Sequence, residues 1–309
     1  MIVDVHFHLT LGPPEMTKLL IQALTGLFLQ YAERMGRPMD AETFIRQAEE
    51  KIPDPNGEKI IEQMEENEID FSLLLMMDYL AAPVEYIQEN NKIAGLLAQE
   101  HSDRLMALAG VDPRRPNATD LLKQCFEEFG CRGLKYHPDL GYDPTSTESY
   151  ELLKILNDNK GVLLTHTGPL GRDARSRLAE TSLLADVVVD FPDLPIIAAH
   201  MGFINWRPWA SLAAYNPNFY GDLAMWDEKA IGNYSFFCRE LRDLIDATGV
   251  EKVMFGTDDP FNTVLRPTKE YIQLIRKLPD NAPEGIQFTT EEVEAMLGGN
   301  AAALLGLTT

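Results

Sequence analysis

Two histidines lie one residue apart near the start of the chain, in the run IVDVHFHL. Because side chains alternate between the faces of a strand, a strand here places His6 and His8 on one face, opposite Phe7. Two imidazoles on a buried face need partners for their ring nitrogens. A metal ion would supply those partners, and so would ordinary hydrogen bonds, so this run alone leaves both explanations open.

The other histidines decide between these explanations. Of the six histidines in the chain, only His101 lies away from a strand end, at the end of a predicted helix. The others follow apolar runs predicted to be strands, as does one carboxylate; the residues are His6, His8, His137, His166, His200 and Asp258. The carboxyl ends of strands in an α/β barrel meet at one mouth, where active sites lie. Each residue alone could be a hydrogen-bonded polar group, but together they indicate a divalent metal site, with zinc favoured.

Eight short apolar runs alternate with helical patterns along the chain. The predicted strands are Ile2–His8, Ile69–Met77, Arg104–Pro113, Cys131–Pro138, Gly161–Gly168, Leu194–Gly202, Asn218–Trp226 and Lys252–Pro260. Helices are predicted to end at Gly130 and Gly161, since glycine is a common helix stop. Strands that alternate with helices imply parallel pairing, and eight such units make a (β/α)8 TIM barrel. A doubly wound open sheet is the alternative, but no GxGxxG motif follows the first strand.

A long connection separates the first two predicted strands. Residues 10–68 hold two helical patterns, Met16–Gly36 and Asp40–Ile52, where a single helix would suffice. The first pattern carries enough apolar surface to need burial. We expect this insertion to pack on the barrel, to cover the site as a lid or to form a dimer contact, within a single domain of residues 1–309.

Composition excludes several classes of function. The chain has 309 residues, 48 acidic against 27 basic, and a formal charge of −21. Such an acidic surface repels phosphate backbones and anionic lipid, so nucleic acid and membranes are not expected partners. Three cysteines without CxxC spacing indicate neither a disulfide framework nor a thiolate zinc site. Without a secretory signal or an apolar run long enough to span a bilayer, the sequence favours a cytoplasmic enzyme with a small-molecule substrate.

The order of these residues resembles a known family. The HxH pair on the first strand, the histidines on the fifth and sixth and the aspartate on the eighth look like the amidohydrolase superfamily. The motifs GLKYHP, AHMGF, NPNFYGDLAMW, FGTDDPF and GGNAAALLGL are similar to its amidohydrolase-related (amidohydrolase 2) branch. That branch includes aminocarboxymuconate-semialdehyde decarboxylase, γ-resorcylate decarboxylase and 4-oxalomesaconate hydratase. The resemblance covers nearly the whole chain.

The resemblance implies roles for particular residues. One zinc ion per chain would be held by His6, His8, His166 and Asp258 together with a water, and His200 would be the base or electrophile facing the substrate. Some members of the superfamily carboxylate a lysine on the fourth strand so that it bridges two metals. In that alternative Lys135 and His200 would hold a second ion; otherwise Lys135 forms an ion pair with Asp258 or a substrate carboxylate.

Loops beyond the predicted strand ends carry candidates for substrate binding. Arg172 and Arg207 could hold a substrate carboxylate, or could be surface arginines on an acidic protein. His137 and Lys135 share a face of the fourth predicted strand and are candidates for the same role. Several aromatic side chains form either a wall of the site or packing beneath the loops; these are Phe203, Trp206, Trp209 and Trp226.

These features predict a metal-dependent hydrolase that acts on a small organic acid, amide, ester or lactone. A metal-bound water with a pKa near 7 would attack the carbonyl, Asp258 would carry the proton and His200 would stabilise the oxyanion. The alternative is a zinc-dependent non-oxidative decarboxylase or hydratase of a carboxylated aromatic or unsaturated acid. Two further alternatives are an inactive barrel that serves as a binding or scaffold protein and an oligomeric structural protein, although a homodimer is also compatible with an enzyme.

Overall fold

The computed structural model describes residues 1–11, 14–169 and 174–308. Within them, eight strands follow one another in the sheet in sequence order, β1 to β8, with helices between them. This is the strand order of a (β/α)8 fold. The chain divides into two compact units, Met1–Asp70 with Leu223–Thr309, and Phe71–Asp222. The prediction that residues 1–309 form one domain stays a prediction.

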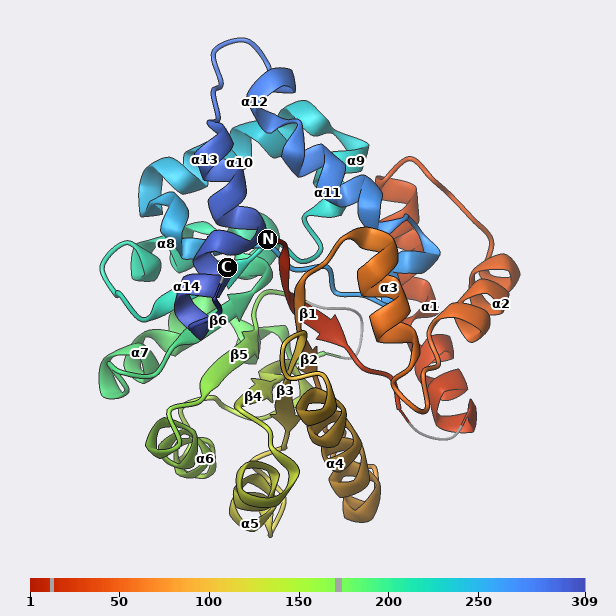
Figure 1. Cartoon of the computed structure of the whole chain (residues 1–309), viewed down its shortest axis with the longest axis vertical. Coiled ribbons are helices and arrows are strands. Elements are labelled where there is room, and N and C mark those ends of the chain that lie inside the picture. The colour runs from red at the N-terminus through yellow and green to blue at the C-terminus, as the bar shows by residue number, and fades with distance from the viewer. Residues whose placement is uncertain (12–13, 170–173, 309) are drawn as a thin grey trace. The chain divides into compact units, whose positions relative to one another are not determined.

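The unit built from Phe71–Asp222 holds six parallel strands (Figure 1). They are β2 (Phe71–Leu75), β3 (Leu105–Gly110), β4 (Gly133–Tyr136), β5 (Val162–His166), β6 (Ile196–Ala199) and β7 (Phe219–Asp222). The register of β4 and β5 pairs Lys135 with Leu164. The helices of this unit are α4 (Val84–Glu100), α5 (Ala118–Gln124), α6 (Thr147–Asp158), α7 (Ala185–Asp190) and α8 (Arg207–Ala213). Apolar strand side chains form its core, as the buried Leu108, Leu134 and Leu164 illustrate.

The unit formed by the two ends of the chain holds β1 (Val3–His8) and β8 (Val253–Met254). Its helices are α1 (Pro14–Arg34), α2 (Ala41–Lys51), α3 (Lys59–Asn67), α9 (Asp227–Gly232), α10 (Tyr234–Thr248), α11 (Thr268–Arg276), α12 (Leu278–Asn281), α13 (Thr290–Glu294) and α14 (Asn300–Leu305). The chain after β8 continues beside β1, since Val5 donates its N–H to the carbonyl of Phe255 at 3.0 Å. All described strands are shorter than their predicted runs, and β8 is only two residues long.

Local signals explain where several helices begin and end. The Asp40 side chain caps α2 by accepting a 2.8 Å hydrogen bond from the N–H of Thr43. Helix α5 continues as a π-helical turn, Cys125–Phe129, which ends at Gly130 in the left-handed region with φ of 83°. The stop predicted at Gly161 is wrong by three residues, because α6 ends at Asp158 and Lys160 takes the left-handed conformation at φ of 52°.

The insertion between β1 and β2 contains α1 and α2, which lie side by side, and α3 (Figure 1). Phe28 of α1 stacks on Phe44 of α2 with ring centroids 5.8 Å apart, and on Phe261 at 5.9 Å. Phe261 in turn meets the His8 ring edge-on at 6.1 Å. The insertion therefore packs against the chain after β8 within its own unit, and its packing on the barrel stays a prediction. Its roles as a lid or a dimer contact stay predictions.

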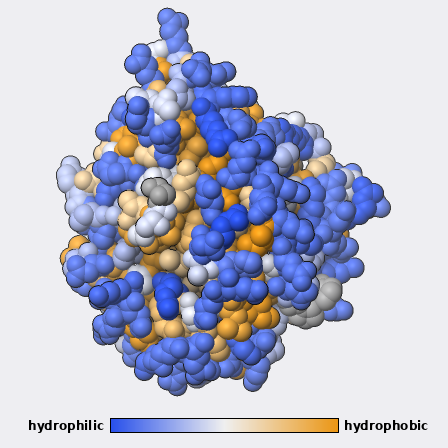
Figure 2. Space-filling view, viewed as in Figure 1, coloured by the Kyte–Doolittle hydropathy of each residue, from blue (hydrophilic) through white to orange (hydrophobic). Residues whose placement is uncertain are grey.

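Hydrophilic side chains cover much of the face drawn in Figure 2. Among the described residues, no helix is both long and apolar enough to cross a membrane.

The buried sheet gives a stability prediction. Leu134→Ala removes a fully buried side chain of β4 and should lower the free energy of unfolding by about 2–5 kcal/mol, measured by urea unfolding. Leu96→Ala is the matched control, because Leu96 on α4 is 47% exposed and its loss should change stability by less than about 1 kcal/mol. Equal losses for the two variants would contradict this description of the core.

Candidate metal centre and active-site residues

Two histidines and an aspartate converge in the unit formed by the chain ends. His6 and His8 lie on one face of β1, with their Nε2 atoms 3.2 Å apart. The Asp258 Oδ1 atom lies 3.5 Å from Nε2 of His6 and 3.1 Å from Nε2 of His8. All three residues are at most 9% exposed. The alternation of side chains along β1 and the path of the chain after β8 thus bring three potential ligand atoms together.

Backbone hydrogen bonds place Asp258 beside the histidines. The N–H of Asp258 donates to the carbonyl of His6 at 2.8 Å, and the N–H of His8 donates to the carbonyl of Asp259 at 2.7 Å. Asp258 adopts the left-handed region with φ of 58°, which aspartate tolerates better than most residues. This turn directs its carboxylate toward the histidines.

Asp4 joins β1 to the segment after β8 that carries Asp258. Its carboxylate accepts hydrogen bonds from the backbone N–H of His6 at 3.0 Å, the N–H of Thr257 at 3.0 Å and the Thr257 hydroxyl at 2.7 Å. Burial raises the pKa of Asp4 to about 7, although these hydrogen bonds oppose the shift. The sequence analysis missed this residue, since an aspartate at the start of a strand carries no signal for its partner.

The donor set fits a divalent cation. Metal bonds of about 2.1 Å place neighbouring donor atoms roughly 3.4 Å apart at tetrahedral angles and roughly 3.0 Å apart at octahedral angles. The separations of 3.1–3.5 Å among the three atoms fall in this range. Imidazole nitrogens with a carboxylate oxygen suit zinc and manganese alike. The residues present therefore fit a divalent metal without selecting one ion.

Three of the other four histidines, His137, His166 and His200, lie close together in the second unit. The rings of His137 and His166 stack with centroids 4.6 Å apart and planes 9° from parallel. The His200 ring lies 5.0 Å from that of His166 and stacks on Phe203 at 4.6 Å. Three strands position them, because His166 ends β5 while His137 and His200 follow β4 and β6 directly. The prediction that His166 completes the ligand set of His6, His8 and Asp258 stays a prediction.

Buried polar groups contact the His137 imidazole and the backbone next to the other two histidines. His137 Nδ1 lies 2.6 Å from the Oδ1 atom of Asp139, whose side chain is 1% exposed. The backbone N–H of His200 donates to the Asp222 carboxylate at 2.8 Å. Thr167 donates its hydroxyl to the carbonyl of Ala199 at 2.6 Å and thereby ties the end of β5 to β6. Asp139 and Asp222 are functional candidates that the sequence analysis missed, although the HxD spacing of His137 and Asp139 could have suggested the first.

His166 has the properties of a metal ligand. Burial lowers its pKa well below the usual value, which Asp139 opposes only in part, so the imidazole is neutral. Its Nε2 atom is buried and has no hydrogen-bond partner among the described residues. A neutral imidazole with a free ring nitrogen is the form that binds metals.

The remaining predicted residues have separate environments. Lys135 of β4 is 3% exposed, and with His137 and Tyr142 it lines a cavity of about 10 Å³, enough for one water. Arg207 starts α8 with its guanidinium 4.5 Å from the centre of the Trp206 ring. Trp206, Trp209 and Trp226 are buried, whereas Phe203 is half-buried against His200, and both explanations for the aromatic side chains stay predictions. Arg172 lies outside the described residues.

A comparison with known protein families identifies the family of this chain. The amidohydrolase family model matches residues 3–307, nearly the whole chain. The chain belongs to the amidohydrolase family. The resemblance read from the motifs is therefore confirmed, as is the prediction that the chain is an enzyme. No curated protein matches the chain.

Solved structures of similar fold cover almost all of this chain. An uncharacterised TIM-barrel protein from Bordetella bronchiseptica is 18% identical over 99% of this chain and 98% of its own, with a TM-score of 0.69. A 5-carboxyvanillate decarboxylase from Novosphingobium aromaticivorans, complexed with manganese, is 13% identical over 99% and 96%, with a TM-score of 0.68. A dihydroxybenzoic acid decarboxylase from a Polaromonas species, also with manganese, is 16% identical over 99% and 97%, with a TM-score of 0.66. These likenesses confirm the predicted TIM-barrel fold.

The Asp139 carboxylate gives a prediction for pH dependence. Burial alone would raise its pKa, but His137, His166 and Lys135 hold the pKa of Asp139 well below its usual value. The unfolded state then binds more protons between the two pKa values, so this contribution to stability is present above about pH 4 and is lost as the pH falls further. At pH 6 the metal-free original protein should have a larger free energy of unfolding than the metal-free Asp139→Asn variant. The difference between the two free energies should become smaller as the pH is lowered toward 2. A gap independent of pH in urea titrations would contradict this assignment.

Proposed function

We propose that this amidohydrolase-family enzyme is a divalent-metal-dependent, non-oxidative decarboxylase of a small carboxylated aromatic or unsaturated acid. The proposed metal site is supported by the close approach of three potential ligand atoms, those of His6, His8 and Asp258. Support for decarboxylation comes from solved structures of similar fold that are named as decarboxylases. This chain matches them over nearly their whole length. The hydrolase, which the sequence analysis put first, has weaker support, since the similar structures whose names specify a reaction are decarboxylases.

In this proposal the two histidines and Asp258 hold the cation, with His166 as the predicted fourth ligand. When bound, the cation supplies positive charge that can hold a carboxylate or hydroxyl oxygen of the substrate. The donor set suits zinc or manganese, and the sequence prediction of one zinc per chain competes with the manganese found in two relatives. The second metal at Lys135 and His200 remains the alternative.

The reaction needs a proton at carbon. As the carbon–carboxylate bond breaks, carbon dioxide leaves and the electron pair stays on the ring or vinyl carbon, which takes up one proton. Asp258 or His200 is proposed to deliver it. The turn at Asp258 and the hydrogen bond from the His200 N–H to Asp222 hold these residues in place. His137, Lys135, Arg172 and Arg207 stay predicted substrate-binding residues, and a homodimer stays a predicted assembly.

The metal site is tested by removing its ligands. His6→Ala and His8→Ala should each lower the bound metal, measured by elemental analysis after dialysis, to well below one equivalent while the circular dichroism spectrum is retained, because each variant loses one donor. His101→Ala is the matched control, since His101 follows α4 and is not among the predicted ligands. Retention of stoichiometric metal in both ligand variants would contradict the site.

The reaction is tested with carboxylated phenols, unsaturated diacids, lactones and amides on the metal-loaded protein. Release of carbon dioxide with formation of the decarboxylated product is the expected result. Asp258→Asn should lower that rate at least about a hundredfold, because it removes both a charged ligand and a proton carrier. Hydrolysis of lactones or amides without carbon dioxide release would overturn decarboxylation in favour of the hydrolase.

A further inference from the structure

A buried arginine lies behind the turn that carries Asp258. Arg266 precedes α11, and its side chain is 0% exposed. Its Nε donates to the Asp227 carboxylate at 2.5 Å and its Nη1 to the Asp259 carboxylate at 3.2 Å. Its Nη2 donates to the backbone carbonyl of Thr257 at 3.1 Å. One guanidinium thus holds two carboxylates and a carbonyl in fixed directions.

The ion pairs keep this group charged. Burial alone would lower the pKa of Arg266, but Asp259 and Asp227 outweigh that effect and raise it. Thr268 also donates its hydroxyl to the Asp259 carboxylate. A buried charge with this many directed hydrogen bonds resists displacement, because any shift leaves a desolvated charge without its partner.

The contacts of Arg266 bracket Asp258 on both sides along the chain. The guanidinium holds the carbonyl of Thr257, the residue before Asp258, and the side chain of Asp259, the residue after it. Asp4 holds the N–H and hydroxyl of Thr257 from the direction of β1. Because Asp258 itself is in the left-handed region, its backbone needs this support to keep the carboxylate beside the histidines.

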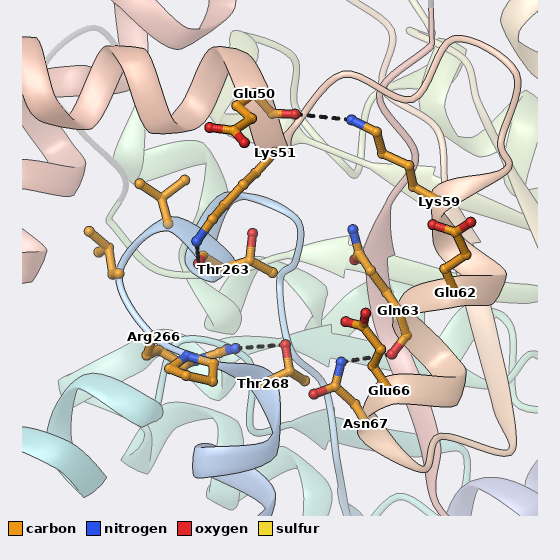
Figure 3. A pocket seen from close by; sticks show the side chains of 13 residues that line it. Glu50, Lys51, Lys59, Glu62, Gln63, Glu66, Asn67, Thr263, Arg266 and Thr268 are labelled. Carbon is orange, nitrogen blue, oxygen red and sulfur yellow. Dashed lines mark hydrogen bonds between the residues drawn. The ribbon is translucent and has the colours of Figure 1, made fainter.

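The other end of the network reaches the insertion. Tyr31 of α1 donates its hydroxyl to the second oxygen of Asp227, and this hydroxyl lies 2.6 Å from the carbonyl of Met225. The same arginine also forms part of the wall of a pocket of about 680 Å³ between α2, α3 and the segment before α11 (Figure 3). None of the three proposed ligands lines that pocket. Arg266 reaches the chain on either side of Asp258 through its hydrogen bonds to Thr257 and Asp259.

We propose that Arg266 is a positioning residue for the metal ligand Asp258, acting through Thr257 and Asp259, and that Tyr31 of the insertion supports it through Asp227. The inference rests on the proposed metal site at His6, His8 and Asp258. A role limited to overall stability would leave the affinity of the folded protein for metal unchanged. Metal affinity is therefore the deciding measurement.

The test uses the full chain, stripped of metal and titrated with Mn²⁺, whose free aqueous form is counted by electron paramagnetic resonance. Arg266→Lys keeps the positive charge but cannot span the three acceptors. We expect its Mn²⁺ affinity to fall by about tenfold or more, the range seen when residues that orient metal ligands are changed. The spectrum of the bound ion should also change, since its ligand geometry is altered.

Arg242→Lys is the matched control. Arg242 joins α10 to α13 in the same unit and also contacts two carboxylates and a carbonyl, those of Asp246, Glu292 and Gln287 at 2.8, 2.8 and 3.2 Å. Its replacement removes an equivalent fork away from Asp258. Its Mn²⁺ affinity should stay within about twofold of the original protein, even where its melting temperature falls.

Tyr31→Phe keeps the test decisive if Arg266→Lys does not fold. It removes only the hydroxyl that contacts Asp227, so a folded protein with a smaller loss of Mn²⁺ affinity in the same direction is expected. If the Mn²⁺ affinity is unchanged in every folded variant, the positioning role is overturned while the metal site stands. The same conclusion follows if Arg242→Lys loses as much Mn²⁺ affinity as Arg266→Lys. Absence of Mn²⁺ binding by the original protein overturns the proposed metal site, and this inference with it.

Discussion

The pairing of β1 with the chain beyond β8 is the constraint on which the candidate site depends. Two short hydrogen bonds, from Asp258 to His6 and from His8 to Asp259, join segments some 250 residues apart in sequence. They set the register between the HxH pair and the aspartate, and a slip of one residue would turn the histidines to the opposite face. Since β8 has only two residues in regular pairing, Asp4 and Thr257 contribute much of the remaining order.

Polar groups in this protein are buried in sets rather than singly. Asp4, Asp139, Asp222 and Asp259 are each at most 2% exposed, and each contacts a backbone N–H, an imidazole or a guanidinium. Burial of an isolated carboxylate is unfavourable, and these contacts offset part of that cost. In both units these carboxylates lie next to the histidines or to Asp258. The electrostatic order of the site thus extends beyond the residues that could touch a metal or a substrate.

The features that depend on hydrophobic periodicity and on the positions of strand ends could be predicted from the sequence. Alternation along IVDVHFHL predicted that His6 and His8 share a face, and the recurring apolar runs predicted eight strands and their order. The motifs also led to the correct family. Contacts that depend on tertiary approach were out of reach. Asp4 contacts Thr257, which is 253 residues away, and Arg266 contacts Asp227, which is 39 residues away. Nothing in the residues that flank Asp4 or Arg266 distinguishes these distant partners from other polar groups. The end of α6 was misplaced for a related reason, because a lysine took a conformation that glycine usually takes.

The stack of Phe28, Phe261 and His8 has a consequence for how freely the insertion can change. Phe28 and Tyr31 lie on one side of α1, and through Phe261 and Asp227 they touch the residues that hold the ligand-bearing segments. Much of the outer surface of α1 is exposed, Leu19 to 60%. Homologous insertions of other lengths and compositions should therefore keep an aromatic ring and a phenol at these two positions. Arg34, Arg37 and Lys51 also join the insertion to Glu228, Glu270 and the carbonyl of Thr263, so an exchanged insertion would have to supply these contacts as well.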